Sequence, residues 1–188
     1  MTTKILKGAF AITLIFTTLA FTTMNKDINI KDSTVVWKGK KITGSHTGTI
    51  QFSSGTLQLE DDTIIGGEFV IDMTSINVTD LTGESKGKLE GHLKSDDFFG
   101  VNNFPTSKLV ITSAEKTSEG HYVTADLTIK DITEPVNFVL NLNEDTATTS
   151  LKIDRTKYGV RYGSGSFFDN LGDNTISDNF ELDVTLKF

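Results

Sequence analysis

The chain has 188 residues, with 13 Phe, 16 Gly, two Pro and no Cys. The lack of cysteine excludes a disulfide framework, a thiolate nucleophile and a lipid-modified cysteine of the bacterial lipoprotein kind. With 25 acidic against 18 basic residues the formal net charge is −7, which disfavours nucleic acid and anionic lipid surfaces as partners.

The N-terminus has the pattern of a secretory signal peptide. Lys4 and Lys7 flank an almost uncharged apolar run over residues 8–21, which is shorter than the roughly 20 apolar residues that span a membrane. We expect a signal peptide over residues 1–20, with cleavage between 20 and 24, and an uncleaved anchor as the alternative. Cleavage after Ala20 removes two basic residues and leaves a net charge of −9. The mature protein is expected to be periplasmic or secreted, without a membrane span.

The first strand pattern covers residues 42–52. Ile42, His46 and Phe52 share one parity of the alternation, so a regular strand places the imidazole on the apolar face. A buried histidine needs a partner. The partner is either a backbone carbonyl or interior hydroxyl, which is a structural role, or the head group of a ligand.

One segment departs from the strand period. Residues 82–95 carry Glu84, Lys88, Leu89, His92 and Leu93 at spacings of three and four, which predicts one short helix.

Elsewhere apolar residues alternate with polar ones. The alternating sets are Phe69 and Ile71; Leu109 and Ile111; Val123, Ala125, Leu127 and Ile129; Val136, Phe138, Leu140 and Leu142; Leu151 and Ile153; and Leu182, Val184, Leu186 and Phe188. Turn residues such as Ser118-Glu119-Gly120 separate them. Short strands at this spacing predict an all-β barrel or sandwich in one domain over residues 33–188.

Arg155 follows the inward parity of Leu151 and Ile153. An inward guanidinium needs a carboxylate or an anionic ligand group. Asp178 or Glu181 on the last strand is the expected partner, and the alternative is a phosphate or quinone head group.

Aromatic residues collect in two irregular segments. Residues 158–179 hold Tyr162, Phe167 and Phe168, while Phe98, Phe99 and Phe104 follow the predicted helix. Concave apolar sites use such linings. We expect these six residues, with His46 and Arg155, to contact a ligand at the mouth of a barrel.

Metal chemistry is not expected. The three histidines are dispersed, and no cysteine accompanies them, which disfavours zinc. His121 follows Gly120 at a turn, and we expect it to be exposed. We assign no catalytic residue, metal or cofactor. A hydrolase or isomerase that uses His46 or His92 with a nearby Asp is a minor alternative.

Three motifs resemble the YceI-like family of bacterial exported proteins, which are polyisoprenoid-binding, lipocalin-like barrels. The motifs are His92-Leu93-Lys94-Ser95-Asp96-Asp97-Phe98-Phe99 with Asn103-Phe104-Pro105; Gly67-Glu68-Phe69-Val70-Ile71-Asp72; and Asp126-Leu127-Thr128-Ile129-Lys130-Asp131-Ile132-Thr133-Glu134-Pro135-Val136. Asp131 and Glu134 depart from the family pattern, in which Gly and a basic residue are usual at these positions.

The resemblance implies an antiparallel up-and-down barrel that encloses an elongated apolar cavity. It implies a carrier for an isoprenoid, a quinone or another long-chain lipid, rather than an enzyme. It assigns His92, Leu93 and Asp97 to a structural motif, with His92 as a latch between the short helix and the barrel. An exported structural or stress-related barrel with a packed interior is the alternative, and a homodimer is compatible with either.

Overall fold

The computed structural model describes residues 22–61 and 63–188. The expected signal peptide over residues 1–20 lies outside these residues. The elements are β1 (Thr23–Asp27), β2 (Thr34–Lys41), β3 (Gly44–Glu60), β4 (Thr63–Val78), α1 (Gly83–Lys94), β5 (Thr106–Thr117), β6 (Gly120–Ile129), β7 (Ile132–Leu142), β8 (Thr146–Asp154), the 3-10 turns η1 (Arg155–Tyr158) and η2 (Gly172–Asn174), and β9 (Ile176–Lys187).

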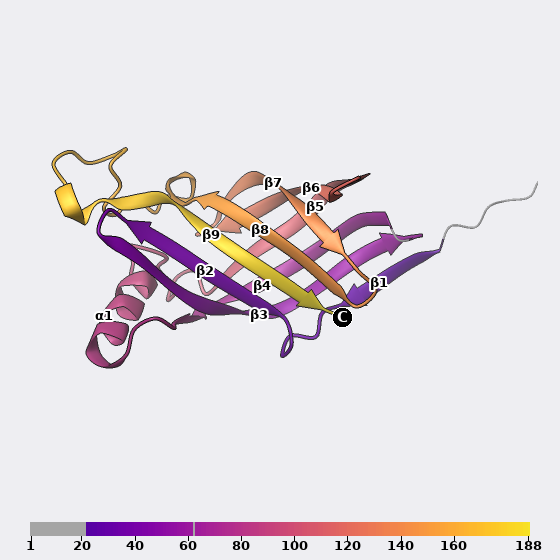
Figure 1. The fold of residues 1–188 in the computed structure, drawn as a ribbon, viewed down its shortest axis with the longest axis horizontal. Coiled ribbons are helices and arrows are strands. Elements are labelled where there is room, and N and C mark those ends of the chain that lie inside the picture. The colour runs from indigo at the N-terminus through magenta and orange to yellow at the C-terminus, as the bar shows by residue number, and fades with distance from the viewer. Residues whose placement is uncertain (1–21, 62) are drawn as a thin grey trace, which may run out of the picture.

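The strands form a closed antiparallel barrel. Strands β2 to β9 each pair with the next strand along the chain except at the closure, where β9 pairs with β2. The ring therefore has up-and-down connectivity, and α1 is the α-helix of the described chain (Figure 1). This confirms the all-β, lipocalin-like barrel with one short helix that the sequence predicts.

Strand β1 was not predicted. Its sequence, Thr-Met-Asn-Lys-Asp, has no apolar alternation, but residues 23–27 pair with residues 56–60 of β3. The 17-residue β3 extends beyond β2, which pairs only with residues 44–50. Strand β1 therefore satisfies the backbone of β3 where β2 no longer reaches it.

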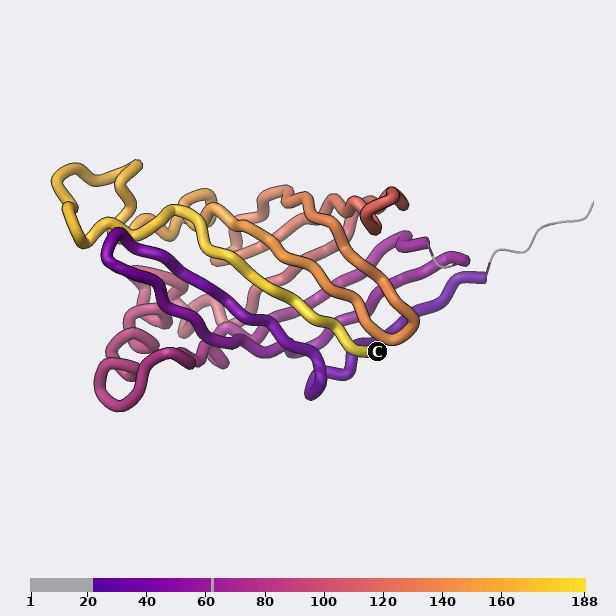
Figure 2. The backbone as a smooth tube through the Cα atoms, viewed as in Figure 1, coloured from indigo at the N-terminus to yellow at the C-terminus, as the bar shows by residue number. Residues whose placement is uncertain are grey.

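The two ends of the barrel differ. Helix α1, the turn between β2 and β3, and the long connection between β8 and β9 gather at one end, while β1 and the C-terminus lie at the other (Figures 1 and 2). We call the first the helix end, defined by residues 41–44, 79–105, 129–132 and 155–175, and the second the C-terminal end.

The predicted alternation is visible in the burial of the strands. Val123, Ala125, Leu127 and Ile129 of β6 are at most 8% exposed, and they belong to one apolar cluster inside the barrel. A smaller cluster of Met73, Ile76 and Val101 joins β4 to the segment after α1. The inward set of each strand therefore forms the inner wall of the barrel.

Candidate ligand-binding cavity

The inner wall encloses a cavity of about 510 Å³. This lies within the range of about 300–1,000 Å³ that is usual for small-molecule sites. Inward residues of every strand from β2 to β9 line the cavity, together with Leu89, His92 and Leu93 of α1. These three helical residues lie at spacings of three and four, so one face of the helix covers the cavity.

The pairing between strands shows how deep each lining residue lies. We call a set of residues that are paired across adjacent strands a rung. Three rungs cross β3, β2, β9 and β8: His46–Gly39–Phe180–Ile153 nearest the helix end, then Gly48–Trp37–Leu182–Leu151, then Ile50–Val35–Val184–Thr149. Polar lining residues concentrate at the helix end, namely Lys40, Lys41, Ser45, His46, His92, Arg155, Tyr162, Asn174, Ser177 and Asn179, with Ser107 and Lys108 at the adjoining start of β5. Deeper positions are apolar except for Thr149. The cavity is therefore polar at one end and apolar along its length.

Five rings form a connected series at the helix end, which we call the aromatic collar: Tyr162, His92, Phe98, Phe99 and Phe180. Successive ring centroids lie 4.5, 5.5, 5.2 and 6.3 Å apart, and all four pairs meet edge to face. The collar joins the β8–β9 connection to α1, to the segment after it and to β9. All five rings line the cavity.

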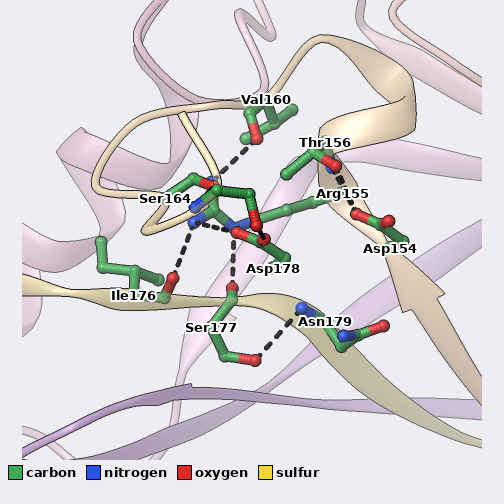
Figure 3. Close-up of polar contacts among 10 residues, drawn as sticks. Asp154, Arg155, Thr156, Val160, Ser164, Ile176, Ser177, Asp178 and Asn179 are labelled. Atoms are coloured by element: carbon green, nitrogen blue, oxygen red, sulfur yellow. Dashed lines mark hydrogen bonds and ion pairs between the residues drawn. The ribbon is translucent and has the colours of Figure 1, made fainter. Parts of the chain in front are cut away.

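Arg155 is the most buried charged residue of the site, at 2% exposure. Its guanidinium donates hydrogen bonds to three backbone carbonyls: Nε to Ser177 at 2.9 Å, Nη1 to Val160 at 2.8 Å and Nη2 to Ile176 at 3.1 Å (Figure 3). Its carbon Cζ also lies 5.4 Å from the Phe98 ring centre. Arg155 thus ties the β8–β9 connection to the start of β9.

Asp178 is the carboxylate beside this guanidinium, with Oδ1 3.8 Å from Nη2 of Arg155. The sequence predicted this pairing, whereas its other candidate, Glu181, pairs with Lys40 at 2.5 Å. Burial raises the pKa of Asp178, but the Ser164 and Ser166 hydroxyls and the Arg155 charge outweigh it, so the pKa lies below the ordinary 3.8. Burial lowers the pKa of Arg155 and the charges of Asp178 and Asp154 oppose that shift, but the pKa stays below its usual value.

The lowered pKa of Asp178 predicts a loss of stability in acid. A depressed carboxyl pKa contributes stability above the unfolded-state pKa, and this contribution disappears as the pH falls from about 4 through the folded-state pKa. The variant D178N is expected to be about 2 kcal/mol less stable than wild type at neutral pH. The difference should shrink below about pH 4 in urea unfolding measurements. The matched control D169N, exposed on the same connection, should follow the wild-type curve. A constant difference across pH would contradict the role of Asp178.

His46 lies at the rim of the cavity. Its side chain is 35% exposed, and Nδ1 lies 3.0 Å from Oδ2 of Asp80. The parity of His46 is inward as predicted, because it lines the cavity beside Gly39, but it is only partly buried because it lies next to the β2–β3 turn, where Ile42 is 67% exposed. Burial raises the pKa of Asp80, but the His46 imidazole and the Thr47 backbone hold it below its usual value. The partner is therefore a carboxylate, as in the minor catalytic alternative, and not a backbone carbonyl, an interior hydroxyl or a ligand head group.

The three residues of the expected structural motif, His92, Leu93 and Asp97, differ in their surroundings. The His92 ring packs between Phe98 and Tyr162 in the aromatic collar, and Leu93 packs against the cluster of Met73, Ile76 and Val101. Asp97 is exposed, whereas its neighbour Asp96 accepts a hydrogen bond from Asn103 at 3.2 Å. The helix itself is held by Glu90, which accepts the backbone N–H of Val78 at 2.8 Å.

Three of the predicted ligand contacts lie outside the cavity lining. Phe167 and Phe168 are 47% and 51% exposed, and the Phe167 ring stacks with the Arg161 guanidinium, 4.5 Å away. Phe104 lies 5.9 Å from the Lys130 ammonium. These residues occur in irregular segments, where no period indicates which side chains point inward. Phe98, Phe99, Tyr162, His46 and Arg155 do line the cavity.

The expectation for His121 was wrong. It was expected at an exposed turn but is 6% exposed. It belongs to β6, where it pairs with Lys116 and Leu140. The turn itself ends one residue earlier, so His121 already has the inward parity of Val123.

Trp37 was not singled out from the sequence, although it is the single tryptophan of the chain. It lines the cavity, and its indole Nε1 donates to the Thr49 carbonyl at 3.2 Å. It faces Gly48 across the β2–β3 pair. The isolated Trp in an alternating segment was the signal that could have identified it.

Two further findings concern the described residues. In residues 22–61 and 63–188, no three His, Asp or Glu side chains come together in a cluster that could hold a metal ion. Within the same part of the chain, no helix has the length and hydropathy needed to cross a membrane.

Known proteins resemble the chain at the level of family and fold. A family model described as the YceI-like domain matches residues 27–188. A UPF0312 protein of Photorhabdus laumondii is 40% identical over 45 residues, which are 24% of this chain and 23% of that protein. The match thus spans less than a quarter of that relative's length.

Two solved structures show the same fold. BcnA of Burkholderia cenocepacia superposes with a TM-score of 0.67 at 20% identity, over 85% of this chain and 98% of BcnA. A polyisoprenoid binding domain from Saccharophagus degradans, implicated in plant cell wall breakdown, gives 0.56 at 16% identity, over 85% and 95%. At these identities the likeness concerns the barrel and not its contents.

Proposed function

The chain belongs to the YceI-like domain family, and on that premise we propose that it is an exported carrier which holds a long-chain apolar amphiphile inside the barrel. The ligand class is an isoprenoid, a quinone or a similar lipid. The function is binding without catalysis. Export is supported by the N-terminal pattern of Lys4, Lys7 and the apolar run that follows them.

The observation that carries the proposal is the cavity of about 510 Å³ with its largely apolar lining. Burial of a chain contributes about 0.8 kcal/mol per CH₂. About ten buried carbons therefore offset the roughly 4 kcal/mol or more that association costs. The polyisoprenoid-binding description of the Saccharophagus degradans relative points to the same ligand class.

A packed-interior barrel is the alternative function. It requires side chains to fill the barrel, and a cavity of this size speaks against it. The homodimer stays a prediction. The catalytic alternative now rests on the His46–Asp80 pair at the rim, and it predicts turnover that H46A abolishes while the protein still folds.

Native mass spectrometry of the exported protein from its own source is the direct test. A retained lipid of defined mass is expected, because a preformed apolar cavity releases a long chain slowly. Absence of any lipid, together with no uptake of an isoprenoid quinone by the purified protein, would argue for the packed-interior alternative.

Filling the cavity should abolish binding. Val35 is 4% exposed on the inner face of β2 and lines the cavity, whereas its neighbour Val36 is 38% exposed on the outer face. The variant V35F is expected to weaken binding of a long-chain quinone at least tenfold, because its ring occupies space that the chain needs. V36F is the matched control and should bind like wild type. Fluorescence of Trp37, which lines the same cavity, is the readout. Equal affinities for the two variants would place the ligand outside the barrel.

A further inference from the structure

Three buried polar atoms of the cavity lining make no hydrogen bond with the residues that the structure describes: Nε2 of His92, Oγ of Ser107 and Oγ1 of Thr149. Of these three residues, His92 belongs to the aromatic collar. Its ring lies 4.5 Å from Tyr162 and 5.5 Å from Phe98 between centroids, and it lines the cavity. An unsatisfied buried nitrogen costs about 1–3 kcal/mol. A ligand atom that bonds to Nε2 recovers this cost on binding.

Most charged side chains that line the cavity already have partners. The Arg155 guanidinium faces Asp178 and bonds to three backbone carbonyls. His46 pairs with Asp80, and Lys40 with Glu181. Lys41 also lines the rim, but it is solvent-exposed. A phosphate group in the collar would therefore lose its hydration and would be repelled by the carboxylates of Asp178 and Asp80. It would find no unpaired buried cation to compensate for these costs.

The polarity of the lining determines which end of the cavity holds the head group of the ligand. Inward from the His46–Gly39–Phe180–Ile153 rung, the lining becomes apolar at Val35, Ile50 and Val184, with the hydroxyl of Thr149 as the single polar group of that rung. A long chain lies along this apolar part, so its head group stays at the helix end, beside His92.

We propose that the aromatic collar selects an amphiphile with an uncharged, hydrogen-bonding head group, such as an alcohol, amide or quinone, and that His92 Nε2 makes the selecting hydrogen bond. This rests on the proposed function, because it assumes that a long chain occupies the cavity. His92 is then a specificity-determining residue in addition to packing α1 against the β8–β9 connection. A hydroxyl both donates and accepts, so it satisfies either imidazole tautomer.

Three probes that share one hydrocarbon chain test the proposal. The full-length, exported protein is titrated with farnesene, farnesol and farnesyl phosphate, with Trp37 fluorescence as the readout. Farnesol is expected to bind about tenfold more tightly than the hydrocarbon farnesene, and farnesyl phosphate more weakly than farnesol. Failure of all three probes to bind contradicts the proposed function itself. Binding of all three with farnesyl phosphate equal to or tighter than farnesol overturns the head-group inference alone.

Variants of His92 identify the selecting atom. H92L should lose the preference for farnesol over farnesene, whereas H92Q, which keeps a hydrogen-bonding group, should retain part of it. K88L, which makes the same kind of change on the exposed face of α1, is the control and should keep the wild-type preference. Farnesene binding by H92L shows that the cavity is intact. If H92L does not fold, the comparison of H92Q with wild type decides. An undiminished farnesol preference in the folded variants would overturn the role of His92.

Discussion

Replacement of Gly48 by alanine is expected to destabilise the barrel by about 3 kcal/mol, because no space exists for a side chain there. A Cβ at this position would lie 2.1 Å from the Asn77 carbonyl oxygen and 2.4 Å from Cζ2 of Trp37. The carbonyl belongs to the backbone of β4, so relief requires a shift of the β3–β4 pair. The Trp37 ring would also have to move, although its indole N–H donates a hydrogen bond to the Thr49 carbonyl.

Urea unfolding measures the loss for G48A, and Trp37 emission should shift to longer wavelength as the indole becomes more exposed. G39A is the matched control, because Gly39 lies on the neighbouring strand and an added Cβ has nothing within 4 Å. Its stability should change by no more than about 0.5 kcal/mol. A G48A protein as stable as G39A would mean that the indole does not cover Gly48 in solution.

Removal of the Arg155 guanidinium is the second large effect. R155M is expected to lose about 3–5 kcal/mol, because it leaves the carboxylate of Asp178 without its cation and three backbone carbonyls without donors. R155K should recover little, since one ammonium cannot reproduce the planar fork that bonds to Ser177, Val160 and Ile176.

The control for R155M is R161M, six residues further along the same connection. Arg161 is exposed and stacks on Phe167, and such a contact is worth about 0.5–1 kcal/mol at an exposed site. Chemical unfolding of the two variants should therefore differ by at least about 2 kcal/mol. Similar losses would show that the buried network contributes no more than a surface contact.

Much of the barrel wall could be predicted, because alternation is a local property of a strand. Val123 and Leu127 of β6 face inward as their parity requires. The helix could also be predicted from local sequence, because Leu89, His92 and Leu93 have the spacing that places them on one face. The pairing of Arg155 with Asp178 was reached by the same rule, since Arg155 continues the inward parity of Leu151 and Ile153.

The rule failed where the chain leaves the wall. Ile42 shares the parity of Phe52, but it lies in the β2–β3 turn past the barrel and is exposed, whereas His46 lines the cavity only at its rim. Phe104, Phe167 and Phe168 lie in segments without a period, and only the packing of the connections decided that they lie outside the cavity lining.

The sequence by itself determined the all-β class, the inward set of most strands and the resemblance to a family, because side-chain alternation and motifs depend only on residues that are close together in the chain. Tertiary structure alone decided the size of the cavity, the place of β1 along β3, the facing of Trp37 and Gly48, and the aromatic collar around His92. These depend on barrel closure, which brings residues far apart in the chain to the same rung or the same end. The paired charges at the helix end follow from that closure, and they are what favours an uncharged head group.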